Sequence, residues 1–268
     1  MSGSGCLERP DCRIYYEVAG SGPALIFAHG LGGNHLSWWQ QLAHFAPRYT
    51  CVAFAHRGFT PSSPVPGAIA PDAYGEDLAA LIDELGLKDV RLVAQSMGGW
   101  TCLDYALKHP ARVRALLMAC TSGAVDPGGV AGFDKTAFDE WLRRANDAAV
   151  ALEKRGVLGA SGERMAKEQP ALATLYRQIY LQTAADFRAA VRVRIRDLRV
   201  QPATLLAKLP MPVLFLNGEE DIVFPAPAGP GLAQAAAKGR HVSVPRAGHS
   251  VYFERAAEFN RIVEEFLK

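Results

Sequence analysis

The sequence predicts an α/β protein built on a mostly parallel sheet with helices on both faces. Short apolar runs bounded by turn residues alternate along the chain with segments of helical periodicity, an order typical of α/β folds. Most of these runs are apolar on both faces, as in parallel strands that helices cover from two sides. The predicted strands are residues 24–28, 51–55, 90–94, 115–119, 213–217 and 241–244.

The remaining strand candidate, residues 13–18, has a different pattern. Its apolar and polar residues alternate (RIYYEV), which predicts an antiparallel edge hairpin at the start of the sheet. Helices are expected at 98–108, at 251–267 and at 73–85, where Asp72 would be the N-cap and Gly86 the stop signal.

Residues from about 123 to 209 interrupt the alternation of strands and helices. They contain helical patterns divided by glycines and by Pro170, and no convincing strand. We therefore expect a helical insertion between two strands of the sheet. The insertion is short and depends on its neighbours, so the chain is predicted to be one domain over residues 1–268.

Composition narrows the class of protein. The formal net charge is +2 and 21% of the 268 residues are charged, which gives no reason to expect nucleic acid or a membrane as partner. No apolar run reaches the about 18 residues of a membrane span, and residues 1–5 are small and flexible without the order of a signal peptide. Five scattered cysteines fit buried apolar positions better than disulfides or a zinc site. We expect a cytoplasmic monomer or homodimer with a small-molecule substrate.

The segment Ala94-Gln95-Ser96-Met97-Gly98 places a serine between an apolar strand and a helical pattern. This is the setting of a sharp strand-to-helix turn that exposes a serine hydroxyl at the carboxyl edge of a sheet. Small residues are needed two positions before and two after the serine, because the neighbouring backbones crowd the turn. The following helix directs N–H groups toward negative charge near the hydroxyl. Ser96 is the predicted nucleophile; the alternative is a surface serine in a glycine-containing turn.

A glycine-rich loop, HGLGG at 29–33, follows the strand at 24–28. Backbone N–H groups in such a loop can point at a ligand. A phosphate loop is the competing interpretation, but its spacing and its lysine are missing. We predict instead that the N–H groups of Leu31 and Met97 form an oxyanion hole. His29 is expected to be structural, because it lies inside the loop that supplies the donors.

A serine nucleophile needs a base, and the sequence offers seven histidines. His249 lies between the last strand and the last helix, in a loop that emerges at the same edge of the sheet as Ser96. It is the predicted base, and His56, in the loop after the strand at 51–55, is a minor candidate. The other histidines outside the glycine-rich loop fit surface or packing positions: His35, His44, His109 and His241.

The acid that orients the base should come from another loop at this edge. Asp221 follows the strand at 213–217 and gives the chain order Ser, Asp, His. Asp126, after the strand at 115–119, is the main rival, and Glu219 or Glu220 could substitute. The structural alternative for Asp221 is a solvated acidic turn.

Together these motifs resemble the α/β-hydrolase superfamily, especially its small cofactor-free esterases, lactonases and carbon–carbon-bond hydrolases. The resemblance covers almost the whole chain: the HG loop, the SMGG elbow at 96–99, the GEED segment at 218–221 and the AGHS loop at 247–250 stand in the family's order. It implies the α/β-hydrolase fold with a helical lid, located at the insertion of about 123–209. It also implies that no cofactor and no metal take part.

Two motifs depart from the family pattern. Ala94 replaces the first glycine of G-x-S-x-G, and in the loop at 55–62 Ala55 and Thr60 replace the family's aspartate and second glycine. The altered loop leaves the subfamily open. A serine at position 96 argues against the haloalkane dehalogenase and epoxide hydrolase branches, which attack through a carboxylate.

The function predicted from these residues is cleavage of an ester, thioester or lactone bond of a small, largely apolar substrate through an acyl-enzyme. The alternatives keep the fold and the triad. They are a biosynthetic lyase, cyclase or acyl transferase, a C–C bond hydrolase, and a ligand receptor with vestigial activity.

The residues that shape the substrate pocket are less clearly marked. Trp38 and Trp141 are the predicted substrate-binding residues, although Trp38 or its neighbour Trp39 could equally belong to the core. Further aromatic candidates in the lid are Phe133, Phe138, Tyr176, Tyr180 and Phe187. Five arginines crowd the end of the insertion, either as a solvated face or as a site for an anionic group: Arg188, Arg192, Arg194, Arg196 and Arg199.

Overall fold

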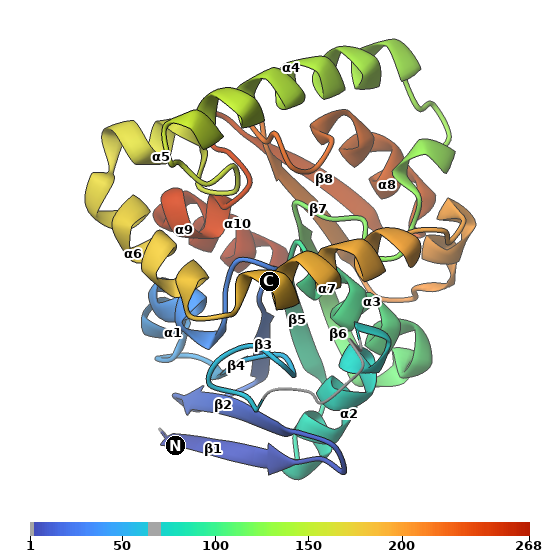
Figure 1. The fold of residues 1–268 in the computed structure, drawn as a ribbon. Helices are drawn as coiled ribbons and strands as arrows, with labels where there is room; N and C mark the ends of the chain where they lie inside the picture. Colours follow the sequence, from blue (N-terminus) through green and yellow to red (C-terminus); the bar gives the residue numbers. More distant parts are fainter. Residues whose placement is uncertain (1–2, 64–70) are drawn as a thin grey trace.

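A computed structural model describes residues 3–63 and 71–268 of the chain. It is built on one eight-stranded sheet with the order β1-β2-β4-β3-β5-β6-β7-β8 (Figure 1). The pairs β1–β2 and β2–β4 are antiparallel, and all other neighbouring pairs are parallel. The strands are β1 (Gly3–Glu8), β2 (Arg13–Ala19), β3 (Ala24–Ala28), β4 (Thr50–Phe54), β5 (Val90–Gln95), β6 (Val113–Ala119), β7 (Val213–Gly218) and β8 (Gly239–Val244). The predicted mostly parallel α/β sheet is confirmed.

Helices cover both faces of the sheet, which explains why its central strands are apolar throughout. Every residue of β3 and β7 is buried. Helix α1 packs against α10 on one face, and α2 packs against α3 on the other (Figure 1). Among the described residues, none of the helices is both long and apolar enough to cross a membrane. The helices outside the insertion are α1 (Trp39–Phe45), α2 (Tyr74–Glu84), α3 (Gly98–Lys108), α8 (Gly229–Ala235), α9 (Val251–Glu254) and α10 (Ala256–Leu267), with short 3-10 turns between them.

The N-terminal segment differs from the expectation of a flexible end. Residues 3–8 form β1, which pairs along its whole length with β2 in the predicted antiparallel hairpin. Glycine and serine have low strand propensity, so the segment gives little signal of its own. The neighbouring strand β2 supplies the hydrogen bonds that make it a strand.

Two helix boundaries also differ from the sequence pattern. Asp72 lies in a 3-10 turn before α2 and forms an ion pair with Arg194, so the helix starts without a side-chain cap. The apolar pattern at 251–267 belongs to two helices, α9 and α10. They are separated at Arg255, whose φ of −127° breaks the helical path.

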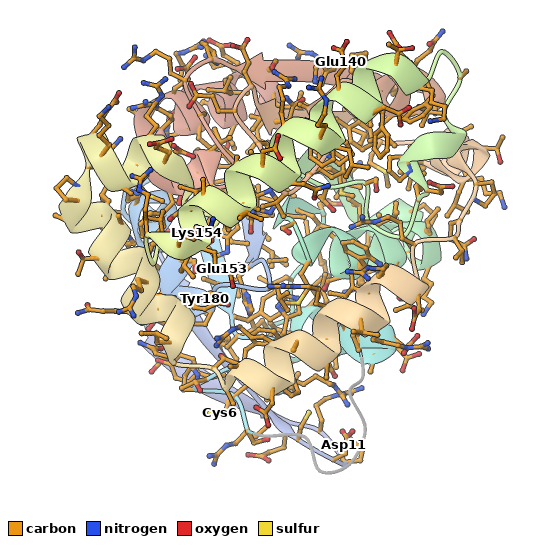
Figure 2. The ribbon with its side chains drawn as sticks, turned by 45° about the horizontal axis from the view of Figure 1, so that its top comes forward. Cys6, Asp11, Glu140, Glu153, Lys154 and Tyr180 are labelled. Carbon is orange, nitrogen blue, oxygen red and sulfur yellow. The ribbon has the colours of Figure 1, made fainter. Side chains whose placement is uncertain are left out.

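The predicted insertion between β6 and β7 is helical. It contains α4 (Lys135–Lys154), α5 (Gly162–Glu168), α6 (Pro170–Leu181) and α7 (Ala185–Asp197). Figure 2 looks onto these helices, with Glu140 and Lys154 on α4 and with Tyr180 where α6 faces α7. The chain enters and leaves the insertion side by side, because Asp126 N–H donates to Gln201 O (2.9 Å) and Gln201 N–H donates to Ala124 O (3.0 Å).

The loop at 55–62, which departs from the family pattern at Ala55 and Thr60, is held by a buried ion pair. Arg57 donates from Nε and Nη2 to the two carboxylate oxygens of Asp77 on α2, each at 2.6 Å. Arg9 also donates to Asp77, and Asp11 accepts a further bond from Arg57. The hydrogen bonds and charge of Asp77 raise the pKa of Arg57 above its usual value. The pair fixes this loop to α2 and to the hairpin region.

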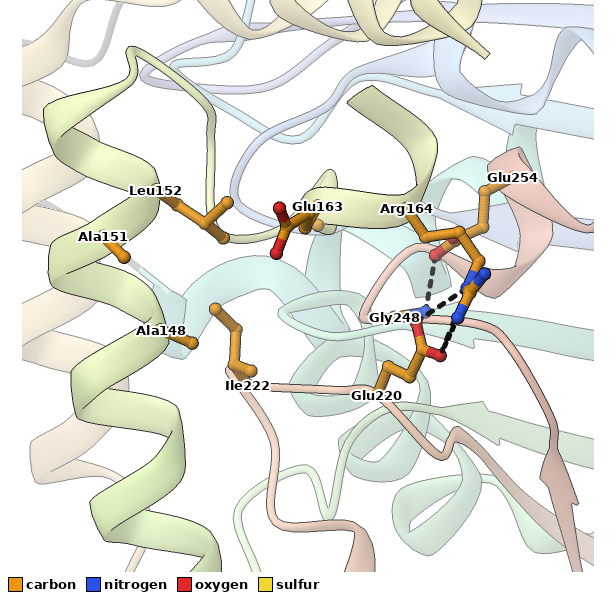
Figure 3. Close-up of a pocket in the computed structure, with 10 residues that line it drawn as sticks. Ala148, Ala151, Leu152, Glu163, Arg164, Glu220, Ile222, Gly248 and Glu254 are labelled. Carbon is orange, nitrogen blue, oxygen red and sulfur yellow. Dashed lines mark hydrogen bonds and ion pairs between the residues drawn. The ribbon is translucent and has the colours of Figure 1, made fainter. Parts of the chain in front are cut away.

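The loop at 247–250 rests on a buried carboxyl group. Gly248 N–H donates to Glu254 Oε1 on α9 at 2.8 Å, and Glu254 is only 4% exposed. Burial raises the pKa of Glu254 to about 7. Behind Gly248 lies a cavity of about 200 Å³, lined by α4, α5 and the loops that follow β7 and β8 (Figure 3).

Replacing Asp77 by Asn should destabilise the fold by about 3 kcal/mol, because it leaves the buried guanidinium of Arg57 without its main partner. Urea unfolding of Asp77→Asn measures this loss. Asp83→Asn is the control, since Asp83 lies on the same helix in an exposed ion pair with Arg112; such pairs are worth about 0–1 kcal/mol. Equal losses in the two variants would contradict a structural role of the buried pair.

The contribution of Glu254 to stability should fall as pH rises from about 4.5 to about 7, because folded Glu254 keeps a proton that the unfolded chain has already released. Glu254→Gln preserves an acceptor for Gly248 N–H and removes this titration. Relative to the parent chain, its free energy of unfolding should rise by roughly 2 kcal/mol at about pH 8, with little change at about pH 5.

Urea unfolding at the two pH values measures the difference. Glu265→Gln, at an exposed carboxylate on α10, is the matched control and should show no such gain. A Glu254→Gln effect of the same size at both pH values would show that Glu254 does not titrate in this range.

Candidate active site

Ser96 lies at the sharp turn between β5 and α3. Its φ of +49° is in the left-handed region, which a residue with a side chain rarely adopts. The turn is held by Ser96 N–H, which donates to Ala119 O on β6 at 2.9 Å. Such strain is concentrated at functional sites, where the surrounding structure has to maintain it.

The glycines around Ser96 are required by close backbone contacts. A Cβ at Gly98 would lie 2.2 Å from Ala28 O at the end of β3. A Cβ at Gly30 would overlap the Gln95 side chain and lie 3.1 Å from the Cβ of Ser96. The HG loop therefore packs directly against the elbow.

The N–H groups of Leu31 and Met97 are available to a ligand. Gly33 N–H donates to Gly30 O (3.0 Å) and closes the turn around Leu31. Among the hydrogen bonds of the described residues, none has Leu31 N–H or Met97 N–H as its donor. Met97 also stands directly before the first turn of α3, where the positive end of the helix dipole lies.

His29 and His56 form a buried structural pair. His29 Nδ1–H donates to Gly30 O (2.7 Å), so its Nε2 is the acceptor for His56 N–H (3.0 Å). Burial lowers the pKa of His29 to about 3 and the pKa of His56 well below its usual value. Both rings stay neutral, and His56 Nε2 is bonded to the Thr101 hydroxyl. His56 is therefore committed to packing and is a poor alternative base.

The structure brings His249 and Asp221 together. The loops after β8 and β7 place His249 Nδ1 2.9 Å from Asp221 Oδ2, and the two residues are 3% and 2% exposed. The carboxylate can only accept, so Nδ1 carries the proton and Nε2 is left as the basic nitrogen. Gln95 Nε2 donates to His249 O at 3.2 Å. The loop of the predicted base is thus hydrogen-bonded to the residue that precedes Ser96.

Asp221 is better placed than its rivals. Its Oδ1 accepts the N–H groups of Val223 (2.7 Å) and Phe224 (2.9 Å), which fix the carboxylate plane. Asp126 is exposed and caps a 3-10 turn through Gly128 N–H. Glu219 and Glu220 are also exposed, and Glu220 is bound to Arg164 on α5.

The two predicted substrate-binding tryptophans have different surroundings. The side chain of Trp38 is fully buried in the core, between Phe27, Tyr252 and Phe259, and its contact with a substrate stays a prediction. Its position on an apolar helical face serves packing. Trp141 on α4 donates from Nε1 to Asp221 O at 2.7 Å, so it lies beside the acid and stays a predicted substrate-binding residue.

The five arginines of the insertion divide into two that pack against aromatic rings and three that are exposed. Arg188 is buried, stacks on Tyr180 and donates to main-chain oxygens at the end of α6, including Tyr180 O at 2.8 Å. Arg199 is partly buried over the Trp100 ring, and its pKa is lowered by burial. The other three arginines of the group are exposed: Arg192, Arg194 and Arg196.

One cluster in the described chain has donor atoms that a metal ion could bridge. Cys120 Sγ, an oxygen of Asp221 and a ring nitrogen of His249 all lie within 4.8 Å of one another. Burial, followed by the charge of Asp221, raises the pKa of Cys120 well above its usual value. Within this cluster, His249 Nδ1 and Asp221 Oδ2 are joined by the hydrogen bond of 2.9 Å.

The sequence analysis missed three residues that surround the pair. Cys120 directly follows β6 at the functional edge, so its position after a predicted strand was an available signal. Gln95 lies inside the elbow motif itself. Glu254 gave no signal, because it occupies a helical position and its burial arises only in the fold.

Comparisons with known proteins agree with this architecture. The family model described as alpha/beta hydrolase fold matches residues 23–256. The chain is 28% identical over 277 residues to 3-oxoadipate enol-lactonase 2 of Acinetobacter baylyi, covering 98% of this chain and 96% of that protein. It is 25% identical over 261 residues to the putative non-heme bromoperoxidase BpoC of Mycobacterium tuberculosis, covering 94% of this chain and 97% of that protein.

A solved structure of similar shape is the thermophilic esterase from Thermogutta terrifontis. Its TM-score is 0.78 at 22% identity, with 100% of this chain and 98% of that chain covered. The fold thus agrees over the full length, and the family model matches most of the sequence. The chain belongs to the α/β-hydrolase fold family.

Proposed function

We propose that this α/β hydrolase is a serine hydrolase that cleaves an ester, thioester or lactone bond of a small, largely apolar substrate. The observation that carries the proposal is the buried hydrogen bond between His249 and Asp221, on a loop that Gln95 ties to the elbow of Ser96. A histidine held in one tautomer beside a strained serine is the arrangement that activates a hydroxyl.

In the proposed reaction, Ser96 attacks the carbonyl carbon while His249 Nε2 takes the hydroxyl proton. Asp221 stabilises the resulting imidazolium. The N–H groups of Leu31 and Met97 hold the oxyanion, and His249 then gives the proton to the leaving oxygen or sulfur. A water molecule activated by His249 attacks the acyl-enzyme and releases the acid.

The largely apolar character of the substrate rests on the surroundings of the oxyanion residues. Met97 belongs to an apolar cluster that Leu31 packs against. Val191 and Ile195 of α7 are part of the same cluster. An acyl group entering between the elbow and α7 would meet side chains of this kind.

The insertion of about 123–209 is proposed to be the lid of a single domain over residues 1–268. A Cβ at Gly32 in the HG loop would lie 3.1 Å from the Tyr180 ring and 3.3 Å from the Tyr176 hydroxyl, so α6 lies against this loop. On α7, Phe187 contacts Phe59 with ring centroids 5.5 Å apart. These contacts of α6 and α7 with the loops at 29–33 and 55–62 support the assignment of the insertion as a lid.

We also propose a cytoplasmic enzyme without a cofactor or metal, acting as a monomer or homodimer. All five cysteines are unpaired, and four of them are buried. Free thiols are typical of reducing compartments. Among relatives of the chain, one named as a lactonase and one named as a putative carbamate hydrolase are 28% and 27% identical, which supports hydrolysis of a carbonyl compound.

Ser96→Ala should abolish covalent labelling by a fluorophosphonate probe and lower ester or lactone hydrolysis by about 10⁴-fold or more, since the nucleophile is lost. Mass spectrometry of the labelled chain and turnover of nitrophenyl esters of increasing acyl length measure the two effects. The thermal midpoint should stay close to that of the parent chain.

Ser243→Ala, at an exposed serine of β8, is the control and should react like the parent chain. Substantial hydrolysis by Ser96→Ala would refute the assignment of the nucleophile. Labelling of Ser96 with no turnover of any ester or lactone would favour a lyase, cyclase, acyl transferase or receptor over a hydrolase.

A further inference from the structure

Cys120 stands next to the predicted acid and base without any role in the proposed reaction. It directly follows β6, and its N–H donates to Leu216 O on β7 at 2.7 Å. Its φ of +53° lies in the region that favours glycine. The side chain is 2% exposed and therefore lies in the interior. A thiol in this strained position is held there by its neighbours.

Those neighbours are the two side chains of the site. The sulfur lies within 4.8 Å of both an oxygen of Asp221 and a nitrogen of His249. The Gly218 backbone and the Asp221 side chain both face the thiol, and the first lowers its pKa while the second raises it. A backbone N–H that points at the sulfur leaves the S–H proton to point at the carboxylate.

The thiol of Cys120 holds its proton more tightly than a free cysteine does. Its pKa is raised well above the usual value, first by burial and then by the charge of Asp221. A thiolate next to a buried carboxylate would be strongly disfavoured. Cys51 and Cys102 are also buried, and burial alone raises the pKa of each.

The carboxylate of Asp221 has room for four hydrogen bonds, two on each oxygen. Val223 N–H and Phe224 N–H occupy Oδ1, and His249 Nδ1–H occupies one position on Oδ2. One position on Oδ2 is left, and the thiol of Cys120 lies within 4.8 Å of an oxygen of Asp221.

We infer that Cys120 is a positioning residue of the hydrolase: its S–H bond to Asp221 holds the carboxylate against His249 Nδ1 and so keeps His249 in the tautomer that activates Ser96. The inference rests on the proposed function. The thiol takes no part in bond making or proton transfer.

Cys120→Ala and Cys120→Ser test this inference, because both replacements meet the same backbone strain as cysteine, and only serine keeps a γ atom that can donate a hydrogen bond. The rate of Ser96 labelling by a fluorophosphonate should fall about fivefold in Cys120→Ala, the effect of losing one modest hydrogen bond. It should stay within about twofold of the parent rate in Cys120→Ser, whose hydroxyl replaces the thiol as donor.

Proton NMR at low field gives a second measurement that does not depend on reactivity. The His249 Nδ1 proton, shielded from water in the parent chain, should exchange faster and broaden in Cys120→Ala and sharpen again in Cys120→Ser. Cys102→Ala removes a buried thiol from α3 and is the matched control. It should change neither the labelling rate nor the resonance.

Parent-like labelling and an unchanged resonance in Cys120→Ala would overturn the inference. Equal losses in Cys120→Ala and Cys120→Ser would also overturn it, because they would assign the effect to volume and not to the donor. If Ser96 of the parent chain does not react with the probe, the proposed function fails, and the resonance alone then decides the role of the thiol.

Discussion

The hydrogen bond between His249 and Asp221 is the interaction on which the rest of the site depends. Both partners are almost completely buried, and a buried carboxylate is stable only when its oxygens are occupied by donors. The loops that carry the pair follow adjacent parallel strands, β7 and β8. Their separation in sequence is therefore irrelevant, because the sheet brings the two strand ends to the same edge.

Several other hydrogen bonds support the two loops that carry His249 and Asp221. Gln95 ties the His249 backbone to the elbow, and Glu254 supports the loop from behind through Gly248. Trp141 holds the Asp221 carbonyl from the side of the insertion. The site is thus supported from the sheet, from α9 and from α4. A rigid frame of this kind is what an orienting acid requires, since its task is geometric.

The sequence could predict the fold and the positions of the candidate residues because both follow from strand ends. Apolar runs mark the strands, and polar residues just after them mark the functional edge; Ser96, Asp221 and His249 all carry this signal. The roles assigned to them remain predictions. The packing of Trp38 among core rings could not be predicted, because an aromatic residue next to a functional loop has the same sequence pattern whether it faces a substrate or the core. Strand β1 was missed because its hydrogen bonds come from its neighbour, and the buried state of Glu254 depends on contacts that no local pattern contains.

The pairing of Val125 with Gln201 at the root of the insertion has a consequence for how this architecture diversifies. The two chain segments pair there, so the insertion is attached to the sheet at a fixed spacing, whatever its own length or structure. This pairing closes the insertion as one long loop, and the entropic cost of closing a loop grows only slowly with its length. The helices between Val125 and Gln201 can therefore be exchanged, lengthened or reoriented without altering the register of β6 and β7. New substrate preferences can arise on an unchanged reaction centre.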